Sequence, residues 1–477
     1  MEGEEQRQPD VSIAARLRQR RITIARNPRG EASFVREDEV IVRLKPGTAS
    51  DRARQTKDAK AILDELGLYQ RPRGGKDTAL RRSGGLLRLR MAGVRDLTRP
   101  PGDRISDAVA RARDRGLDIS PNYVYFGSTN FEGAPTFLGN PTFLGNPTFL
   151  GNPTFLGNPT FLGNPNPRSS ALPADPVPGL SGVVSKQAVG TGPKVLVLDT
   201  GLYTVDDGSG GRQAGPETLR GACVLHDPWR TSEEEKEEDD EDETDGNGDQ
   251  ALDLQSGHGT FIAGIVHRLS PSAQIHIDGV LSSLGDGDDM SIADGLGRAI
   301  GRLGTDQHYD VIVMSLGAYT LDDEPPPLAT AITDLVDPTK TVVVAAAGNN
   351  GSPRIYWPAG LPDVVAVGAL DSGGRAWFSN YGGWVDACAP GVDVRSTFYG
   401  TDDDPLKDPI GDPTDGPFNE FKGWAAWSGT SFAAPKVATV IAAEATRLGI
   451  SAPEAWKRLS HYQHFRYPDL GVVFNVV

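Results

Sequence analysis

The most informative stretch of the sequence for fold and function is the eight-residue segment Ser428-Gly-Thr-Ser-Phe-Ala-Ala-Pro435. Small residues lead into Ser431, and the alanine-rich apolar run that follows to Ala445 predicts a buried helix. Ser431 is therefore expected where a turn becomes a helix N-terminus, because the free backbone N–H groups there favour negative charge. This position suits a nucleophile, but Ser and Thr are also common N-cap residues. The segment alone leaves both interpretations open.

Three further polar motifs lie next to glycine. Asp199-Thr-Gly closes an apolar run, Gly257-His258-Gly opens another, and Gly348-Asn349 follows a third. Glycine beside a polar residue permits a tight turn and the close approach of a substrate. Each motif by itself is also compatible with an ordinary turn or a structural side chain.

From about residue 181 the chain has the pattern of an α/β domain. Short apolar runs bounded by turn residues predict buried strands, and segments with helical spacing lie between them. This alternation favours a mostly parallel sheet with helices on both faces. The expected strands are residues 194–199, 310–315, 341–346 and 364–368, and the expected helices are 258–268, 291–303 and 327–336.

Together the motifs place Asp199, His258, Asn349 and Ser431 in that order within one α/β domain. This order resembles the subtilisin-like serine proteases, or subtilases, over about residues 190–447. The resemblance implies that Ser431 is the nucleophile, His258 the general base, and Asp199 the residue that orients the imidazole. It also implies that Asn349 joins the Ser431 backbone N–H in an oxyanion hole. No metal or organic cofactor is required for this chemistry.

The resemblance further implies an extended polypeptide substrate held along a backbone edge. This edge is Ser315, Leu316 and Gly317, which the family also shows. Gly348 belongs to the same expected substrate-binding set. Tyr356 is expected at the wall of the primary pocket, where it would favour smaller or neutral substrate side chains.

The facing edge is expected at about residues 284–288. Asp286 and Asp288, with the adjacent Asp289, make this edge acidic. We therefore expect a preference for Lys or Arg several residues before the scissile bond. A solvated acidic loop without a role in recognition is the alternative.

Residues 37–127 carry a second pattern, with strand and helix signals in the order β-α-β-β-α-β. This order is typical of a small ferredoxin-like α+β domain, and subtilases commonly carry a propeptide of this kind. The resemblance therefore implies an intramolecular inhibitor whose last strand reaches toward the active site. A fused partner-binding domain of the same shape is the alternative. The expected strands are 39–45, about 68–70, 86–91 and 119–126, and the expected helices are 49–66 and 105–115.

The net charge of −16 is divided unevenly along the chain. Residues 1–126 carry 27 Lys/Arg against 18 Asp/Glu, about +9, which leaves about −25 for the remainder. Such an asymmetry fits either a nucleic-acid-binding segment or two complementary parts of one chain. Because the arginines are interleaved with strand and helix patterning, the second interpretation is favoured and no nucleic-acid partner is expected.

Nothing in the sequence predicts export or membrane insertion. The first 29 residues lack the apolar core of a signal peptide, and no apolar run reaches membrane-spanning length. The two cysteines, Cys223 and Cys388, have no CxxC partner, so free buried thiols are favoured over a disulfide. We therefore expect a cytoplasmic protein without membrane contact.

Two segments have unusual composition. Five identical Pro-Thr-Phe-Leu-Gly-Asn hexamers run from Pro135 to Asn164, and their turn-forming junctions predict a linker expanded by duplication. The alternative interpretations of the repeats are a docking motif or a series of protease cleavage sites. Residues 233–249 form an acidic insertion that is expected to be a solvated surface loop. Its end, Asp245-Gly-Asn-Gly-Asp249, has a hint of calcium-loop spacing, which gives weak support to a structural calcium ion.

The sequence thus divides into a polar basic leader (1–36), an inhibitor-like domain (37–127), a linker with the repeats (128–180) and a catalytic domain (181–477). The predicted function is a serine endopeptidase made as an autoinhibited, self-processing precursor. Two alternatives remain open. One is a dedicated maturation protease for one partner protein or for its own repeats, and the other is a non-catalytic scaffold.

Overall fold

The computed structural model describes most of the two predicted domains. The described residues are 17–127, 168–169, 192–225, 252–408 and 419–476, apart from gaps at 18, 28, 69–80, 84, 92–99, 210, 254, 305, 402–405 and 463–464. The hexamer repeats, the acidic insertion and the first part of the leader lie outside the described residues. The predictions made for those segments therefore stay predictions.

A parallel sheet forms the centre of the second domain. Its main strands follow the spatial order β11-β7-β13-β15-β16-β18, and each neighbouring pair is parallel. Valine and alanine dominate these strands because both faces of the sheet are covered. The strands are β7 (Lys194–Asp199), β11 (Gln274–Gly279), β13 (Val311–Met314), β15 (Val342–Ala346), β16 (Val364–Asp371) and β18 (Ala387–Pro390). All four predicted strands are among them.

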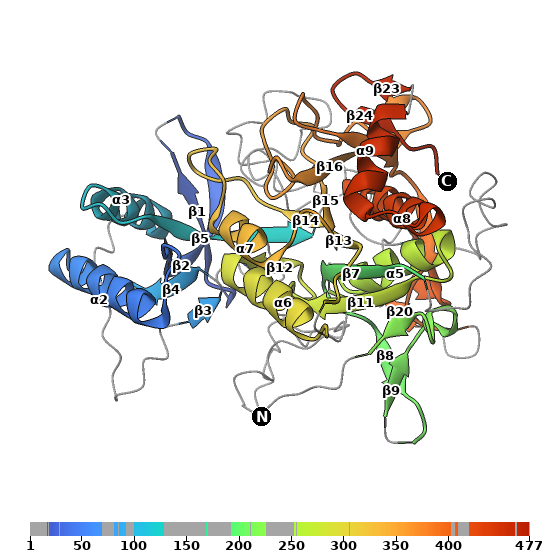
Figure 1. The fold of residues 1–477 in the computed structure, drawn as a ribbon, viewed down its shortest axis with the longest axis horizontal. Helices are drawn as coiled ribbons and strands as arrows, with labels where there is room; N and C mark the ends of the chain where they lie inside the picture. The colour runs from blue at the N-terminus through green and yellow to red at the C-terminus, as the bar shows by residue number, and fades with distance from the viewer. Residues whose placement is uncertain are drawn as a thin grey trace, which may run out of the picture.

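Helices cover both faces of this sheet (Figure 1). On one face lie α5 (His258–Leu269), α8 (Thr430–Leu448) and α9 (Ala452–Tyr462); on the other lie α6 (Asp289–Gly301) and α7 (Pro327–Leu335). Strand β7 shows the division, because successive side chains of a strand point to opposite faces. Val195 and Val197 pack in the apolar cluster of α5 and α8, whereas Leu196 and Leu198 pack with α6 and α7. The predicted α/β fold is confirmed.

The first domain is an antiparallel sheet with two helices. In chain order its elements are β2, α2, β3, β4, α3 and β5, which is the predicted β-α-β-β-α-β sequence. A capping box begins α2, because the Thr48 hydroxyl and the Asp51 carboxylate each accept the other residue's backbone N–H. The bounds are β2 (Ala32–Arg43), α2 (Ala49–Glu65), β3 (Arg81–Ser83), β4 (Leu86–Arg90), α3 (Pro101–Arg113) and β5 (Ile119–Gly127).

Two details of this domain differ from the sequence prediction. Strand β2 begins before residue 37 and pairs with β1 (Ile22–Arg26), so the end of the predicted leader belongs to the sheet. The reason is apolar burial: Ile22 and Phe34 pack against Val124 and Phe126. The strand expected near 68–70 is absent at Leu68, while residues 69–70 lie outside the described part, and β3 takes its place in the order.

Strand β5 joins the two domains. Beyond its pairing with β2, it pairs antiparallel with β12 (Asp286–Asp288) and β14 (Leu316–Gly317) of the second domain. Figure 1 shows β5 extending from the first domain to the labels of these two short strands. A backbone of the first domain therefore lies between two edges of the second.

The other elements of the described residues are short. No helix within the described ranges has the length and apolar character to cross a membrane. The remaining elements are β6 (Arg168–Ser169), β8 (Thr204–Asp206), β9 (Arg212–Ala214), η4 (Glu217–Leu219), β10 (Cys223–Val224), β17 (Gly374–Arg375), β19 (Val394–Thr397), β20 (Leu406–Asp408), β21 (Asn419–Phe421), β22 (Trp424–Trp427), β23 (Arg466–Tyr467) and β24 (Gly471–Val473). Both cysteines are free thiols, as expected.

Candidate active site

The ends of β7 and α5 bring two of the predicted catalytic residues together. Asp199 is the last residue of β7, and His258 is the first residue of α5. The helix end approaches the strand end so closely that a Cβ on Gly259 would lie 2.3 Å from the Gly201 carbonyl oxygen. Glycine at position 259 is therefore a packing requirement of the site.

Asp199 and His258 form a buried pair. The His258 Nδ1 atom lies 2.7 Å from Oδ1 of Asp199, and both side chains are fully buried. The same carboxylate oxygen accepts the Thr200 backbone N–H at 2.8 Å. The imidazole ring also contacts Trp427 and Phe432, with ring centroids 5.3 Å away in each case. The carboxylate and the two aromatic rings together fix the orientation of the imidazole.

Ser431 lies in the first turn of α8, as the sequence predicted. The N-cap of this helix is Gly429 and has no side-chain cap, so the alternative N-cap role for Ser431 is wrong. The Ser431 hydroxyl donates to the Ser315 carbonyl oxygen at 3.2 Å, and Nε2 of His258 is buried without a hydrogen-bond partner in the described structure. The hydroxyl therefore donates to Ser315 and not to the imidazole; catalytic hydrogen bonds often become well aligned only in the reacting complex.

Asn349 lies next to Ser431 through Thr430. The Asn349 Oδ1 atom accepts both the backbone N–H of Thr430, at 2.9 Å, and its hydroxyl, at 2.8 Å. Because the Asn349 side-chain oxygen accepts from Thr430, the NH2 group of the same amide points away from Thr430. This contact of Thr430 was not predicted from the sequence, although Thr430 immediately precedes Ser431.

The expected substrate edges carry a strand of the chain itself. Residues Leu316 and Gly317 lie opposite Gly127 and Phe126, while Ser315 adjoins this edge and contacts Ser431 through both its hydroxyl and its carbonyl group. On the facing edge, Gly287 lies opposite Tyr125. Backbone pairing on both sides is the geometry by which an extended peptide is recognised.

Tyr356, the residue expected at the wall of the primary pocket, packs against the same edge. A Cβ on Gly317 would lie 2.1 Å from the Tyr356 ring, and a Cβ on Gly348 would lie 2.9 Å from it. Gly348 also has a φ of +95°, which a residue with a side chain rarely adopts. The structure therefore brings Gly317, Gly348 and Tyr356 into direct contact.

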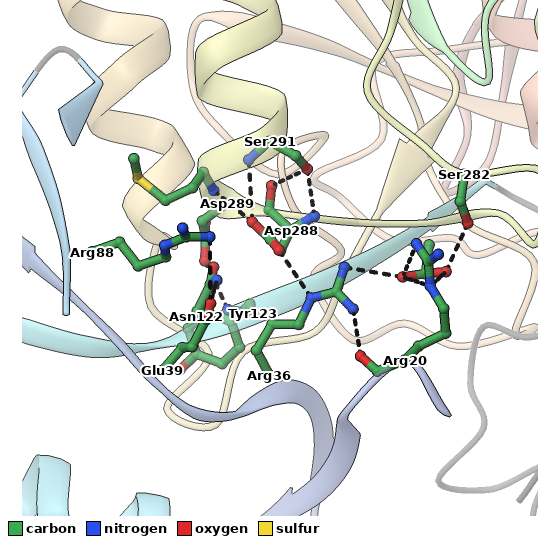
Figure 2. Close-up of polar contacts among 12 residues, drawn as sticks. Arg20, Arg36, Glu39, Arg88, Asn122, Tyr123, Ser282, Asp288, Asp289 and Ser291 are labelled. Atoms are coloured by element: carbon green, nitrogen blue, oxygen red, sulfur yellow. Dashed lines mark hydrogen bonds and ion pairs between the residues drawn. The ribbon is translucent and has the colours of Figure 1, made fainter. Parts of the chain in front are cut away.

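Asp288 points toward Arg36 of the first domain (Figure 2), and Asp286 accepts a hydrogen bond from the same guanidinium. Arg36 lies 3.0 Å from Asp286 and 2.9 Å from Asp288, and Arg20 also pairs with Asp286 at 3.0 Å. Burial alone would raise the pKa of each carboxyl. The combined attraction of Arg36 and a second arginine, Arg20 for Asp286 and Arg88 for Asp288, together with hydrogen bonds, outweighs burial and lowers both pKa values. Arginines of the first domain thus bind this acidic edge, and the expected preference for Lys or Arg in a substrate stays a prediction.

The described part of the chain shows no cluster of side chains suited to hold a metal ion. Among the described residues no three His, Cys, Asp or Glu side chains are grouped as they would be around a metal ion. The hint of a calcium loop at 245–249 falls outside those residues. The side chains brought together here, an imidazole, a carboxylate and a serine hydroxyl, are of the types that serve in acid–base and nucleophilic chemistry.

Comparisons with known proteins agree on one family. The subtilase family matches residues 190–460, more than half of the chain. M-protease from Shouchella clausii (strain KSM-K16) is 34% identical over 265 residues, covering 53% of this chain and 54% of that protein. Subtilisin Savinase from Lederbergia lenta is 33% identical over 261 residues, covering 52% of this chain and 74% of that protein. The chain therefore spans about half the length of the first of these relatives.

Two solved structures are also similar. One is a cold adapted subtilisin-like serine proteinase, with 22% identity, a TM-score of 0.42, and coverage of 66% of this chain and 97% of that chain. The other is the prenylagaramide maturation protease PagA, with 23% identity, a TM-score of 0.42, and coverage of 60% of this chain and 87% of that chain.

Proposed function

The chain belongs to the subtilase family, and we propose that it is a serine endopeptidase that hydrolyses peptide bonds through an acyl-enzyme. The observation that carries the proposal is the buried pair of His258 and Asp199, with Ser431 on the adjoining helix α8. A carboxylate that holds an imidazole is the arrangement that activates a serine hydroxyl. Polypeptides are the proposed substrates, because the two edges beside Ser431 bind an extended backbone.

The proposed reaction begins with a rotation of the Ser431 side chain. The hydroxyl leaves the Ser315 carbonyl and donates to Nε2 of His258, which takes its proton as Oγ attacks the substrate carbonyl. Asp199 accepts the Nδ1–H of His258 and stabilises the imidazolium that forms. The imidazolium then protonates the leaving amine. Water attacks the resulting ester by the same route in reverse and regenerates Ser431.

The developing oxyanion is stabilised by two donors, the Asn349 side-chain NH2 and the Ser431 backbone N–H. Thr430 keeps Asn349 in the productive orientation by occupying its carbonyl oxygen. Preorganised donors of this kind act without reorganisation at the moment of reaction, and losing one lowers kcat by about 10²–10³-fold in a related serine protease.

We also propose that the first domain is an intramolecular inhibitor. Its strand β5 pairs with both β12 and β14, the edges that an extended substrate would use. The Arg36 and Arg20 ion pairs with Asp286 hold the same domain against the acidic edge. While β5 remains in place, another polypeptide has no access to these backbone groups.

Self-processing follows from the direction of β5. Gly127, its last residue, lies opposite Leu316, one residue from Ser315, whose carbonyl accepts the Ser431 hydroxyl. We propose that the first cut falls within the few residues that follow Gly127. The first hexamer repeat begins at Pro135, eight residues further along the chain, so the repeats are a second candidate substrate.

The endopeptidase proposal can be tested with a fluorophosphonate probe, which reacts only with an activated serine. The chain is expected to be labelled, and Ser431→Ala is expected to abolish labelling. Ser428→Ala is the matched control, because Ser428 belongs to the same motif but its hydroxyl accepts the Asp393 backbone N–H. Labelling that persists in Ser431→Ala, or that never occurs in processed wild type, would refute the proposal.

A further inference from the structure

Successive side chains of strand β5 point to opposite faces and pack in two different apolar clusters. Val124 and Phe126 pack with Ile22 and Phe34 of the β1–β2 hairpin. Tyr123 and Tyr125 lie on the opposite face, in an apolar cluster that contains Met290, Ile292 and Leu328 of the second domain. The two tyrosines are 1% and 0% exposed. Because β5 lies between the substrate edges, a substrate in its place would bury the corresponding side chains on this same face.

A buried carboxylate lies among these tyrosine contacts. Asp289, the first residue of α6, is fully buried directly after strand β12 (Figure 2). Its Oδ1 accepts the Tyr125 hydroxyl at 2.8 Å and the Leu328 backbone N–H at 2.9 Å, and its Oδ2 accepts the Tyr123 backbone N–H at 2.8 Å. Two of these three donors come from β5, and only Leu328 belongs to the second domain.

Asp289 differs in this respect from its acidic neighbours. Asp286 and Asp288 bind arginine side chains, whereas the Asp289 carboxylate is surrounded by neutral donors. Burial, with a contribution from the charge of Asp288, raises the Asp289 pKa to about 7, although the three donors oppose this shift. A carboxylate in such an environment depends on each donor that reaches it, because an unpaired buried oxygen is strongly unfavourable.

We propose that Asp289 is a specificity-determining residue that selects tyrosine in the polypeptide substrate, at the position that Tyr125 occupies in the inhibitory strand. This inference rests on the proposed endopeptidase function and deepens it. Tyrosine fits because its ring fills an apolar space while its hydroxyl reaches the carboxylate at the end. Phenylalanine fills the same space but has no hydroxyl, so the Asp289 carboxylate loses one hydrogen-bond donor. A site built to bind a hydroxyl discriminates strongly against the analogue that lacks it.

The test uses peptides that copy β5 and its following residues, with Tyr, Phe or Lys at the position of Tyr125. Processed wild-type enzyme is assayed about two pH units above the Asp289 pKa, where the carboxylate is ionised. The kcat/KM for the Tyr peptide is expected to exceed that for the Phe peptide by about 10- to 100-fold. Asp289→Asn is expected to reduce this ratio toward one. Asp286→Asn is the matched control, and its Tyr-to-Phe ratio is expected to remain that of wild type.

The outcomes separate the two proposals. If the peptides are cleaved with equal kcat/KM for Tyr and Phe, or if Lys is preferred to both, the tyrosine inference is wrong and the endopeptidase proposal stands. If no peptide is cleaved and Ser431 is not labelled by a fluorophosphonate, the proposed function fails and the inference fails with it.

A second readout does not depend on a soluble Asp289 variant. In the full-length chain, Tyr125→Phe removes the hydroxyl that donates to Asp289 and so weakens the binding of β5 to the second domain. Fluorophosphonate labelling of Ser431 is therefore expected to be about 10-fold faster than in wild type. Val124→Ala, on the opposite face of the strand, is the control for a general loosening of β5. If Tyr125→Phe is labelled no faster than wild type, the hydroxyl does not anchor the strand and the inference is contradicted.

Discussion

Thr430 donates two hydrogen bonds to a single atom of Asn349. Its backbone N–H and its hydroxyl reach Oδ1 at 2.9 and 2.8 Å, and the same hydroxyl accepts the Gly348 backbone N–H at 3.2 Å. This bond set fixes which end of the Asn349 amide is available to a substrate. Thr430 is therefore a positioning residue for the proposed oxyanion hole.

Replacing Thr430 with valine is expected to lower kcat by about 10-fold with little change in KM, because the donor lost acts through Asn349 on the transition state. The measurement is steady-state hydrolysis of one peptide by the processed enzyme. Thr439→Val is the matched control on the same helix, since its hydroxyl donates to the Pro435 carbonyl and touches no substrate group. A change confined to KM would contradict the positioning role.

Asp199→Asn is expected to lower kcat by about 10⁴-fold, a value taken from the equivalent substitution in another serine protease. The physical reason is that the Asn amide no longer holds the His258 Nδ1–H and no longer stabilises the imidazolium. Single-turnover hydrolysis by the processed variant provides the measurement. If the variant retained more than about a tenth of wild-type kcat, the assigned role of Asp199 would be wrong.

Arg36→Ala is expected to release the first domain from the second. In the parent protein the largely buried Arg36 guanidinium lies 3.0 Å from Asp286 and 2.9 Å from Asp288. The variant removes both of these ion pairs. Breaking a buried pair costs about 3 kcal/mol or more, so fluorophosphonate labelling of the full-length chain should accelerate by about 100-fold.

The matched control for Arg36→Ala is Arg21→Ala. Arg21 lies in the same part of the first domain and pairs with Asp38 at 3.0 Å, but 52% of its side chain is exposed. Exposed pairs contribute at most about 1 kcal/mol, so this variant should be labelled at nearly the wild-type rate. Equal rates for the two variants would show that the buried ion pairs do not hold the first domain against the second.

Lys436 makes the stability of the second domain depend on pH. The residue is 4% exposed in α8, and burial, assisted by the charge of Arg268, lowers its pKa from 10.5 to about 8. Between these two values the unfolded chain binds more protons than the folded chain, so the free energy of unfolding rises with pH across that window. Below the folded-state pKa the penalty for burying the charge is complete.

Lys436→Met is therefore expected to be more stable than the parent near neutral pH, by at most on the order of 3 kcal/mol. This advantage should shrink as the pH rises toward 10.5. Urea unfolding in a Ser431→Ala background measures it without self-cleavage. Lys457→Met, at an exposed position of α9, is the control. An advantage for Lys436→Met that is independent of pH would refute the assignment.

The catalytic part of the site could be predicted because its information is local. Glycine next to His258 and Asn349, and two residues before Ser431, marks the tight turns, and apolar runs mark the strands and helices whose ends carry these residues. Leu316 and Gly317 pair with β5, and Tyr356 packs against Gly317, but their roles in binding a substrate stay predictions.

The partners of the acidic edge could not be predicted in the same way. Arg36 and Asp288 are 252 residues apart in the sequence, and only the fold makes them neighbours. The role of Asp289 depends on the alternation of side chains along β5, which becomes meaningful only once the register with β12 is known. The start of β2 was missed because charged residues surround Phe34, whose burial comes from a distant strand.

Ser431 is proposed to cut the chain just after strand β5. Mass spectrometry of the full-length wild type beside Ser431→Ala tests it most directly. The wild type is predicted to yield a fragment that ends within the few residues after Gly127, and Ser431→Ala is predicted to remain intact. An uncut wild type, or the same fragments from Ser431→Ala, would contradict the claim.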